Sequence, residues 1–301
     1  MDNIVITGVC GHIGSALLES LSENVNVIAV DNMLTQRYSS LFGLNIKIKF
    51  YESNFLDIDI PEGSTVIHLG AVTDAASSIN NPEQVEKTNV FQTLQFIDKC
   101  IQSKVKRFIF PSSTSVYGVA QDVVNEDNSK FENPQSPYAE SKLVIEKYLE
   151  SKKEELEYVV VRFGTIFGTS KGMRFHTAIN KFCWQASLKL PITVWKENFH
   201  QTRPYLGLKD AIKALNHVMN LDSKHCNTKY NILTGNYKLS EIVDLIKQQV
   251  PDLQIEMVNT PLLNQYSYHV DSSKIQATGF IANCSLDTEI KKTLSLLNKL
   301  A

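Results

Sequence analysis

The chain has 301 residues, of which 43% are hydrophobic and 21% are charged, and its formal net charge is −2. These values are typical of a globular protein, and the small net charge gives no reason to expect a nucleic acid or an acidic membrane as the main partner. No apolar run is long enough to span a bilayer, and the N-terminal residues MDNIVITG lack the basic segment of a signal peptide.

The first half of the sequence alternates short β-rich runs with helical patterns. Predicted strands lie at 3–7, 26–30, 46–51, 65–69, 107–111 and 158–162, and predicted helices lie at 12–22, 83–103 and 137–153. Apolar strands separated by helices are typical of a parallel sheet with helices on both faces. The fold class predicted is therefore α/β, with a doubly wound parallel sheet.

The pattern loosens after residue 165, where prolines punctuate the chain. Predicted helices lie at 176–188, 209–220, 239–249 (led by Ser240) and 286–299, and predicted strands lie at 191–195 and 229–233. No flexible linker or repeat is visible, so we expect a second lobe that is interleaved with the first. Trp195 could line a pocket in this half, but we predict that it packs in the core.

A glycine-rich loop joins the first predicted strand to the first predicted helix. In IVITGVCGHIGS (4–15), Gly8 allows a sharp turn out of the strand, Gly11 lets a diphosphate approach the backbone, and Gly14 allows close packing of helix and strand. The alternative is a tight structural turn. However, Asp31 lies 20 residues beyond Gly11 at the end of the second strand. A carboxylate there accepts hydrogen bonds from ribose hydroxyls and repels a 2′-phosphate, so the pattern predicts NAD over NADP.

The five cysteines are widely scattered, at 10, 100, 183, 226 and 284. No C-x-x-C or Cys/His ligand spacing appears, and an odd number cannot all pair within the chain. We therefore expect reduced thiols, a cytoplasmic protein and no metal site. Cys10 lies inside the glycine loop, where it could sense redox state, but we favour a small side chain that simply fits.

A tyrosine followed four residues later by a lysine occurs at Tyr138/Lys142, Tyr148/Lys152 and Tyr205/Lys209. Only the first pair follows a helix-starting signal, because Ser136 and Pro137 suit the N-cap and first helical positions. Tyr138 and Lys142 would share one face of the first turn. The helix N-terminus and the ammonium both favour a phenolate over a phenol whose ordinary pKa is about 10. We predict that Tyr138 is a general base near neutral pH.

The other two pairs are predicted to be structural. Tyr148 lies ten residues further along the same helix, roughly 80° around and about 15 Å away, so it cannot serve the same pocket and should pack against a neighbouring helix. Tyr205 precedes Gly207 at the start of another predicted helix, where Lys209 lies beside Asp210.

The strand at 107–111 ends in PSSTSVYG (111–118). Ligands of open parallel sheets bind beyond the carboxyl ends of the strands, so Ser112, Ser113 and Ser115 are predicted to point their hydroxyls toward that rim. A serine there could hydrogen-bond the oxygen whose proton the tyrosine removes. The alternative is an ordinary polar exit from a strand.

Together these residues resemble the extended short-chain dehydrogenase/reductase family, specifically its nucleotide-sugar epimerase/dehydratase branch. Matching motifs follow the family order across nearly the whole chain: TGVCGHIGS (7–15), Asp31, FLD (55–57), HLGA (68–71), Asn89-Val90, PSSTSVYG (111–118), PYAESK (137–142), RFGTIFG (162–168), TRPYLGLKD (202–210) and YHVDSSKIQATGF (268–280). The region from 162 to 210 also looks like a subgroup that includes GDP-heptose 4-dehydrogenases. The resemblance implies a homodimer with a Rossmann sheet and a smaller α/β substrate lobe.

The resemblance also implies a role for each matching residue. Tyr138 would be the catalytic base, Lys142 would bind the nicotinamide ribose and lower the tyrosine pKa, and Ser113 would be the catalytic hydroxyl. The residues implied to bind NAD are Gly8, Gly11, His12, Ile13, Gly14, Asp31, Asn32, Asp57, Ile58, Leu69, Gly70, Ala71, Asn89, Tyr138 and Lys142, with Asp57 and Ile58 at the adenine. The residues implied to bind substrate are Ser113, Ser115, Thr165, Arg174 and Arg203, with Arg203 at the substrate diphosphate.

This resemblance sets the expected lobes. Residues 1–165, with return segments near 204–235, would form the NAD-binding domain. Residues 166–203 and 236–301 would form the substrate-binding lobe.

Departures from the family pattern narrow the chemistry. The 4,6-dehydratases carry an Asp-Glu pair where this chain has Ser115 and Val116, so dehydration is not expected. Thr165 replaces an asparagine usual in the family. Asn264-Gln265-Tyr266 stands where the family usually has an arginine for the diphosphate, so either Arg174 or another residue compensates or phosphate binding is weaker.

The function expected is that of an NAD-dependent nucleoside-diphosphate-sugar 4-epimerase. A net 4-dehydrogenase that releases the 4-keto sugar would use the same tyrosine, lysine and serine. A non-catalytic NAD-binding regulatory protein is a third alternative, but such proteins commonly lose the tyrosine or lysine. The nucleotide and the sugar stay open.

Overall fold

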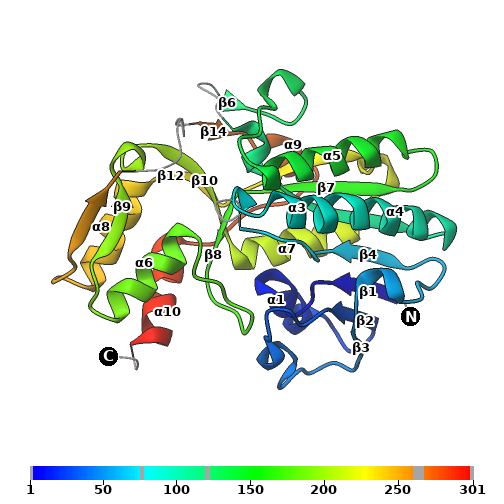
Figure 1. The fold of residues 1–301 in the computed structure, drawn as a ribbon, viewed down its shortest axis with the longest axis horizontal. Coiled ribbons are helices and arrows are strands. Elements are labelled where there is room, and N and C mark those ends of the chain that lie inside the picture. Colours follow the sequence, from blue (N-terminus) through cyan, green and yellow to red (C-terminus); the bar gives the residue numbers. More distant parts are fainter. Residues whose placement is uncertain (1–2, 75–77, 119–122, 260–267, 299–301) are drawn as a thin grey trace.

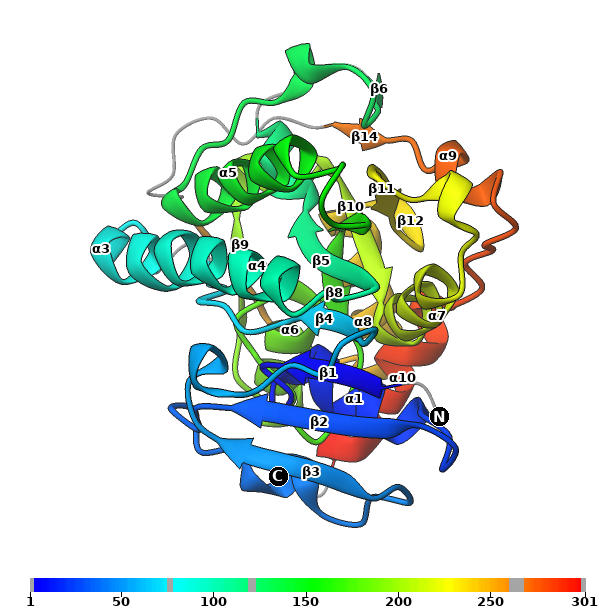
Figure 2. The same cartoon turned by 90° about the vertical axis from the view of Figure 1, so that its right-hand side faces the viewer.

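A seven-stranded parallel sheet forms the centre of the computed structural model, which describes residues 3–74, 78–118, 123–259 and 268–298. The strand order is β11-β7-β5-β4-β1-β2-β3, and Figure 2 shows β3, β2, β1, β4 and β5 side by side. The strands are β1 Asn3–Thr7, β2 Asn26–Asp31, β3 Ile48–Glu52, β4 Thr65–His68, β5 Arg107–Ser113, β7 Tyr158–Phe163 and β11 Thr228–Ile232. The predicted α/β class and parallel sheet are confirmed.

Helices cover both faces of this sheet because its strands are apolar on both sides. One apolar cluster packs helices α4 and α5 on the sheet, through residues such as Phe96 and Ile145. A second cluster packs α1 and α7 on the opposite face, through residues such as Leu17 and Leu215. These helices are α1 His12–Ser20, α4 Thr93–Gln102, α5 Pro137–Ser151 and α7 Leu208–Met219.

The helix predicted at 83–103 is built from three pieces. It comprises α3 Pro82–Val85, a π-helical segment at Glu86–Gln92, and α4. The wider π-helical turn carries Asn89, whose side chain is buried. Such turns occur frequently at functional sites, because they shift the side chains that follow them.

The second lobe lies at the left of Figure 1 and has its own apolar cluster, to which Phe182, Ile246 and Ile290 belong. The described chain has three smaller sheets besides the central one: β8 and β10 are parallel, β10 and β12 antiparallel, β9 and β13 parallel, and β6 and β14 parallel. The strands and helices not yet named are β6 Val123–Val124, β8 Thr165–Phe167, α6 Ala178–Ser187, β9 Ile192–Trp195, β10 Thr202–Gly207, β12 Gly235–Lys238, α8 Leu239–Gln249, β13 Ile255–Val258, β14 His269–Val270, α9 Ser273–Gln276 and α10 Leu286–Leu297. Short 3-10 turns lie at Tyr38–Leu41, Phe55–Asp57, Thr114–Tyr117, Ser129–Phe131, Lys196–Asn198 and Ser223–His225.

Two local predictions need correction. Tyr205 lies in strand β10 and not at a helix start, because the helix begins only after Gly207. Ser240 does not lead α8. The helix starts at Leu239, and the Glu241 carboxylate accepts a hydrogen bond from the backbone N–H of Lys238 at 2.7 Å.

The two-lobe division stays our proposal, with one change at its far end. Ile275 and Phe280 pack in the cluster that covers the central sheet, beside α7. We therefore propose that residues 268–280 return to the first lobe.

No helix in the described part of the chain combines the length and the apolar character needed to cross a bilayer. All five cysteines are free thiols, as predicted. Among the described residues, no three His, Cys, Asp or Glu side chains come together as metal ligands.

Candidate active site

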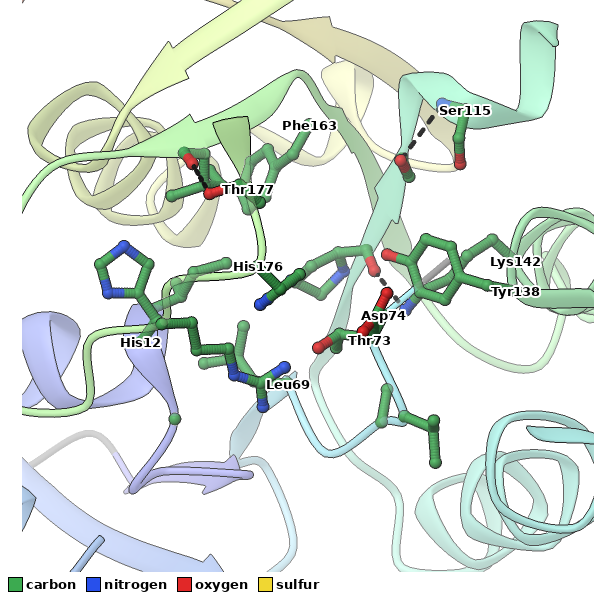
Figure 3. A pocket seen from close by; sticks show the side chains of 18 of the residues that line it. His12, Leu69, Thr73, Asp74, Ser115, Tyr138, Lys142, Phe163, His176 and Thr177 are labelled. Atoms are coloured by element: carbon green, nitrogen blue, oxygen red, sulfur yellow. Dashed lines mark hydrogen bonds between the residues drawn. The ribbon is translucent and has the colours of Figure 1, made fainter. Parts of the chain in front are cut away.

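A cavity of about 1150 Å³ opens beyond the carboxyl ends of the parallel strands, between the two lobes. It brings together most of the predicted site residues: Gly8, Gly11, His12, Ile13, Gly14, Asp31, Asn32, Leu69, Gly70, Ala71, Ser113, Ser115, Tyr138, Lys142, Thr165, Arg174 and Arg203. Figure 3 shows His12 on one side of this pocket and Tyr138 with Lys142 on the other.

The glycine loop at the end of β1 requires its glycines on steric grounds. Gly8 has φ of +66°, and a Cβ there would lie 2.6 Å from the backbone nitrogen of Gly70. A Cβ on Gly14 would lie 2.6 Å from the carbonyl oxygen of Val9. Helix α1 begins directly after Gly11, which supplies no side-chain cap, so the first N–H groups of the helix remain available. This cradle suits a diphosphate.

Asp31 ends strand β2 and lines the same cavity. Its two carboxylate oxygens accept hydrogen bonds from the backbone N–H groups of Cys10 and Met33, each at 2.9 Å. The carboxylate is therefore fixed in orientation while keeping lone pairs for a ribose.

Three predicted cofactor residues do not line the cavity. Ile58 is buried in the apolar cluster under α4, and Asp57 ends the preceding 3-10 turn, whereas Asn54 and Phe55 form the wall there. The turn presents its first residues to the cavity, so Asp57 and Ile58 are not among the lining residues, and their contact with adenine stays a prediction.

Asn89 lies one layer behind the wall. Its side-chain amide donates to the carbonyl of Val72 at 2.9 Å, and its amide oxygen accepts from the N–H of Val72 at 2.8 Å. Asn89 thus fixes the loop after β4, on which Leu69, Gly70 and Ala71 do line the cavity. Asn89 was predicted to line the cofactor channel. The structure instead places it behind the cavity wall, where it supports the loop after β4.

The predicted tyrosine, lysine and serine converge at the other end of the cavity. Helix α5 begins at Pro137, and the Ser136 hydroxyl accepts a hydrogen bond from the N–H of Ala139 at 3.2 Å, as the capping signal predicted. Lys142 donates from Nζ to the carbonyl of Pro111 at 2.8 Å. The Tyr138 hydroxyl is hydrogen-bonded to Ser113.

The electrostatics of this end differ from the prediction. Burial raises the pKa of Tyr138 to about 12, and the hydrogen bond with Ser113 and the charge of Arg174 offset this only partly. Burial lowers the pKa of Lys142 to about 8, although the charge of Glu146 acts in the opposite direction. In the chain alone, desolvation of the phenolate therefore outweighs its neighbours, and the lowering of the tyrosine pKa by Lys142 stays a prediction.

The serines at the end of β5 and just beyond it make different contacts. Ser113 accepts a hydrogen bond from the N–H of Ser115 at 3.1 Å. The hydroxyl of Ser115 lines the cavity and is buried without a partner among the described residues. Ser112, in contrast, donates to the carboxylate of Glu146 instead of pointing to the rim as predicted.

The second lobe supplies the opposite wall. Thr165 on β8 and Arg203 on β10 line the cavity as predicted. The Arg203 guanidinium lies 5.1 Å from the ring centre of Tyr268. Trp195 is half-buried on the cavity wall, so its predicted core packing is wrong. Asn264, Gln265 and Tyr266 lie outside the described residues.

Cationic and imidazole groups missed by the sequence reasoning also line the cavity. These are Arg37 and His176, which join the predicted Arg174 and His12. Arg37 NH1, Arg174 Nε and His12 Nε2 are buried without a hydrogen-bond partner among the described residues. Burial and the charge of Arg174 lower the pKa of His12 to about 3, so its ring is neutral here. Arg37 is the single basic residue between positions 32 and 46, and no sequence motif marks it.

The two other tyrosines are structural, as predicted. Tyr148 donates from its hydroxyl to Asp98 on α4 at 2.5 Å and so ties two helices together. Lys209 forms an ion pair with Glu289 at 2.9 Å, away from Tyr205. Cys10 is fully buried, and burial raises the pKa of its thiol to about 12, which argues against a reactive thiolate.

These observations fit a dinucleotide. The glycine cradle and Asp31 suit a diphosphate and an adenosine ribose, and Arg37 and Arg174 line the same cavity with buried N–H groups that have no partner among the described residues.

Comparisons with known proteins also indicate a protein that binds a dinucleotide. Residues 4–232 match the model of the NAD dependent epimerase/dehydratase family. A putative UDP-glucose 4-epimerase of Methanocaldococcus jannaschii is 26% identical over 304 residues, which cover 97% of each chain. An uncharacterized UDP-glucose epimerase of Bacillus subtilis is 31% identical over 234 residues, or 72% of each chain. The structure of a UDP-glucose 4-epimerase of Thermotoga maritima with UDP-glucose covers 99% of each chain, with a TM-score of 0.86 and 25% identity.

Proposed function

The chain belongs to the NAD-dependent epimerase/dehydratase family, and on that basis we propose that it is a nucleoside-diphosphate-sugar 4-epimerase. The observation that carries this proposal is the convergence of Tyr138, Ser113 and Lys142 at one end of a dinucleotide-sized cavity. The relatives named as UDP-glucose 4-epimerases support it.

The residues that would hold NAD are the glycine loop, Asp31 and the loop that follows β4. NAD bound there would supply an acceptor for the hydride at C4 of the sugar and would give that hydride back to complete epimerisation. Tyr138 takes the proton from the C4 hydroxyl and gives it back to the keto oxygen. Ser113, already hydrogen-bonded to Tyr138, shares the hydrogen bond of that oxygen. Lys142 stays fixed on the carbonyl of Pro111 and presents its remaining N–H groups to the ribose.

Elimination of water is not proposed. The family's dehydratases place an acid pair where this chain has Ser115 and Val116, and the Val116 side chain is fully buried. No carboxylic acid that could protonate a departing hydroxyl therefore stands at these two positions. Some relatives are nonetheless named dTDP-glucose 4,6-dehydratases, one of them 27% identical.

A net 4-dehydrogenase uses the same three residues and is the second candidate, because residues 162–210 resemble that subgroup. In an epimerase the hydride returns to the sugar, whereas a dehydrogenase leaves reduced cofactor behind. Absorbance in the NADH band during turnover distinguishes the two. A lasting rise would favour the dehydrogenase.

The Tyr138→Phe substitution tests the proposed catalysis. Loss of a general acid/base typically costs about 10²- to 10⁴-fold in rate, so turnover should fall by at least about 100-fold while NAD binding is kept. Tyr148→Phe is the matched control. It alters the Tyr148/Lys152 pair, which has the same spacing on the same helix, and should leave turnover within about twofold. Near-normal turnover of Tyr138→Phe would contradict the assignment.

The nucleotide is tested by melting temperature. Ligands that bind the folded chain stabilise it by mass action, so the NAD-loaded protein should melt highest with its own nucleotide among UDP, GDP, CDP and dTDP. The names of the relatives make UDP the first choice. If none of the four raises the melting temperature, a nucleotide-sugar substrate is contradicted.

We also propose a homodimer formed by paired helices. Phe91 and Val144 are exposed, at 56% and 44%, on the π-helical segment and on α5, which lie next to each other. Paired helices from two copies would cover these side chains. Light scattering after gel filtration should give twice the chain mass, and Phe91→Glu should shift it to the monomer.

A further inference from the structure

A short segment of the second lobe lies directly on the glycine loop. We call residues 168–174, between β8 and α6, the clasp; in Figure 1 this connection descends from β8 toward α1. The catalytic steps above make no use of it, apart from the charge of Arg174 near Tyr138.

The tip of the clasp packs against the cradle backbone without a gap. A Cβ on Gly172 would lie 2.4 Å from the carbonyl oxygen of Gly11 and 2.5 Å from that of Cys10. The N–H of Gly172 donates to the hydroxyl of Ser15 on α1 at 3.0 Å, in a buried contact. Only glycine permits this approach.

A second pair of contacts holds the clasp to the first residue of α1. The Ser170 hydroxyl donates to the carbonyl of His12 at 2.9 Å. The same hydroxyl oxygen lies 2.8 Å from Nδ1 of His12. Because a hydroxyl has one hydrogen and gives it to the carbonyl, Nδ1–H must donate to Ser170. The clasp therefore fixes the orientation of the His12 ring.

One buried amide joins the two ends of the clasp. Asn180, on α6, is fully buried. Its oxygen accepts from the N–H of Gly168 at 3.1 Å, and its nitrogen donates to the carbonyls of Gly168 at 3.2 Å and Arg174 at 3.0 Å. The clasp is thus a closed loop with fixed ends whose tip rests on the cradle.

This geometry positions Arg174 between the two ends of the cofactor cavity. Its Nε is buried without a partner among the described residues, and its side chain lines the cavity. Its charge acts on Asp31 at the adenosine end and on Tyr138 at the nicotinamide end. The diphosphate of a dinucleotide lies between these ends, and arginine is well suited to bind it.

We propose that the clasp completes the cofactor site, with Arg174 binding the diphosphate of NAD and the clasp opening before NAD can leave. Arg174 is thereby reassigned from the substrate, where the family pattern had placed it, to the cofactor. The proposal depends on NAD binding in this cavity and not on the identity of the sugar or on epimerisation. It implies that NAD stays bound through repeated turnovers.

The test measures release of NAD in the absence of any sugar. Protein loaded with labelled NAD is chased with excess unlabelled NAD, and the label that stays on the protein is followed with time. Gly172→Ala forces the clasp off Gly11, and Arg174→Gln removes the charge. Each should speed release by about tenfold or more. Ser170→Ala, which removes only two hydrogen bonds, should speed it severalfold and provides the test if Gly172→Ala fails to fold.

Arg203→Gln and Ser187→Ala are the matched controls. Arg203 is the arginine assigned to the substrate, and the Ser187 hydroxyl donates within α6 to the carbonyl of Cys183, its one hydrogen-bond partner in the described part of the chain. Both controls should release NAD at the wild-type rate. Release within twofold of wild type in both Arg174→Gln and Ser170→Ala would overturn the proposal, as would equal acceleration by Arg203→Gln.

A second measurement distinguishes whether Arg174 binds the cofactor or the substrate. UDP and GDP are titrated onto the NAD-loaded proteins. Arg174→Gln should leave their dissociation constants unchanged, whereas Arg203→Gln should weaken whichever one binds. If Arg174→Gln weakens nucleotide binding and leaves NAD release unchanged, the original substrate assignment of Arg174 holds and this proposal falls. Failure of the proposed epimerase activity alone would not alter either readout.

Discussion

Replacing Arg162 with methionine tests how much the buried charges behind the catalytic residues contribute to the fold. The Arg162 side chain is fully buried and bridges two carboxylates, at 2.5 Å from Glu146 and 2.6 Å from Glu132. Glu146 in turn accepts from Ser112 and acts electrostatically on Lys142. The guanidinium therefore neutralises two acids that lie beneath the active site.

The expected loss follows from removing the ion-pair partner of Glu146 and leaving Glu132 with Lys229 alone, at 3.3 Å. Removing one partner of a buried ion pair typically costs about 3–5 kcal/mol, because the remaining charge is desolvated without compensation. For a urea m-value of about 3 kcal mol⁻¹ M⁻¹, the unfolding midpoint should fall by about 1 to 2 M. Methionine keeps much of the volume, so little of this loss is a cavity effect.

The pH dependence of this stability loss shows whether the unpaired carboxylate causes it. Without Arg162, the ionised carboxylate of Glu146 would lie buried without its ion-pair partner. The loss of stability should then be small below about pH 4, where the carboxylates are protonated. It should grow as the pH rises and they ionise, because only an ionised carboxylate carries the cost of burial without a partner. Urea unfolding at pH 5 and pH 8 measures this directly.

The double variant Arg162→Met with Glu146→Gln provides the control. It removes one of the stranded charges and should recover part of the stability at pH 8. A single variant that loses less than about 0.5 kcal/mol, or a double variant no more stable than the single, would refute the reasoning.

Two further substitutions test the cofactor end and the lysine. Because burial lowers the pKa of Lys142 to about 8, the folded chain releases this proton before the unfolded chain does. Stability should therefore rise between about pH 8 and 10.5, by at most about 3 kcal/mol. Lys142→Met should flatten that rise in urea unfolding; an unchanged slope would contradict the low pKa. Asp31→Ala should lower the preference for NAD over NADP by about tenfold or more in measured dissociation constants, and an unchanged ratio would remove Asp31 from the ribose.

The parts of the site that the sequence predicted correctly are those with local causes. Tyr138 could be chosen among three tyrosines because a serine and a proline start its helix, and these act on adjacent residues. The glycine loop was likewise readable, since Gly8 and Gly14 are required by contacts close to the loop itself.

The parts that were missed depend on distant neighbours. The raised pKa of Tyr138 comes from burial by both lobes, which no spacing in the sequence encodes. Asn180 resembles any polar residue near a helix start, and only the folded chain shows that its amide joins Gly168 to Arg174. Which residues near Asp57 and Ile58 face the cavity is decided by a 3-10 turn, which the sequence pattern does not reveal.

Strand β11 has a consequence for how the protein is made. It pairs with β7 and completes one edge of the central sheet, yet residues 164–227 are synthesised between the two strands. All six residues of β7 are buried in the finished fold. A nascent chain that ends before residue 228 therefore exposes β7 as an unpaired apolar edge, which is prone to aggregation. The NAD-binding half cannot mature on the ribosome ahead of the substrate lobe, and a truncated first half should need a chaperone to stay in solution.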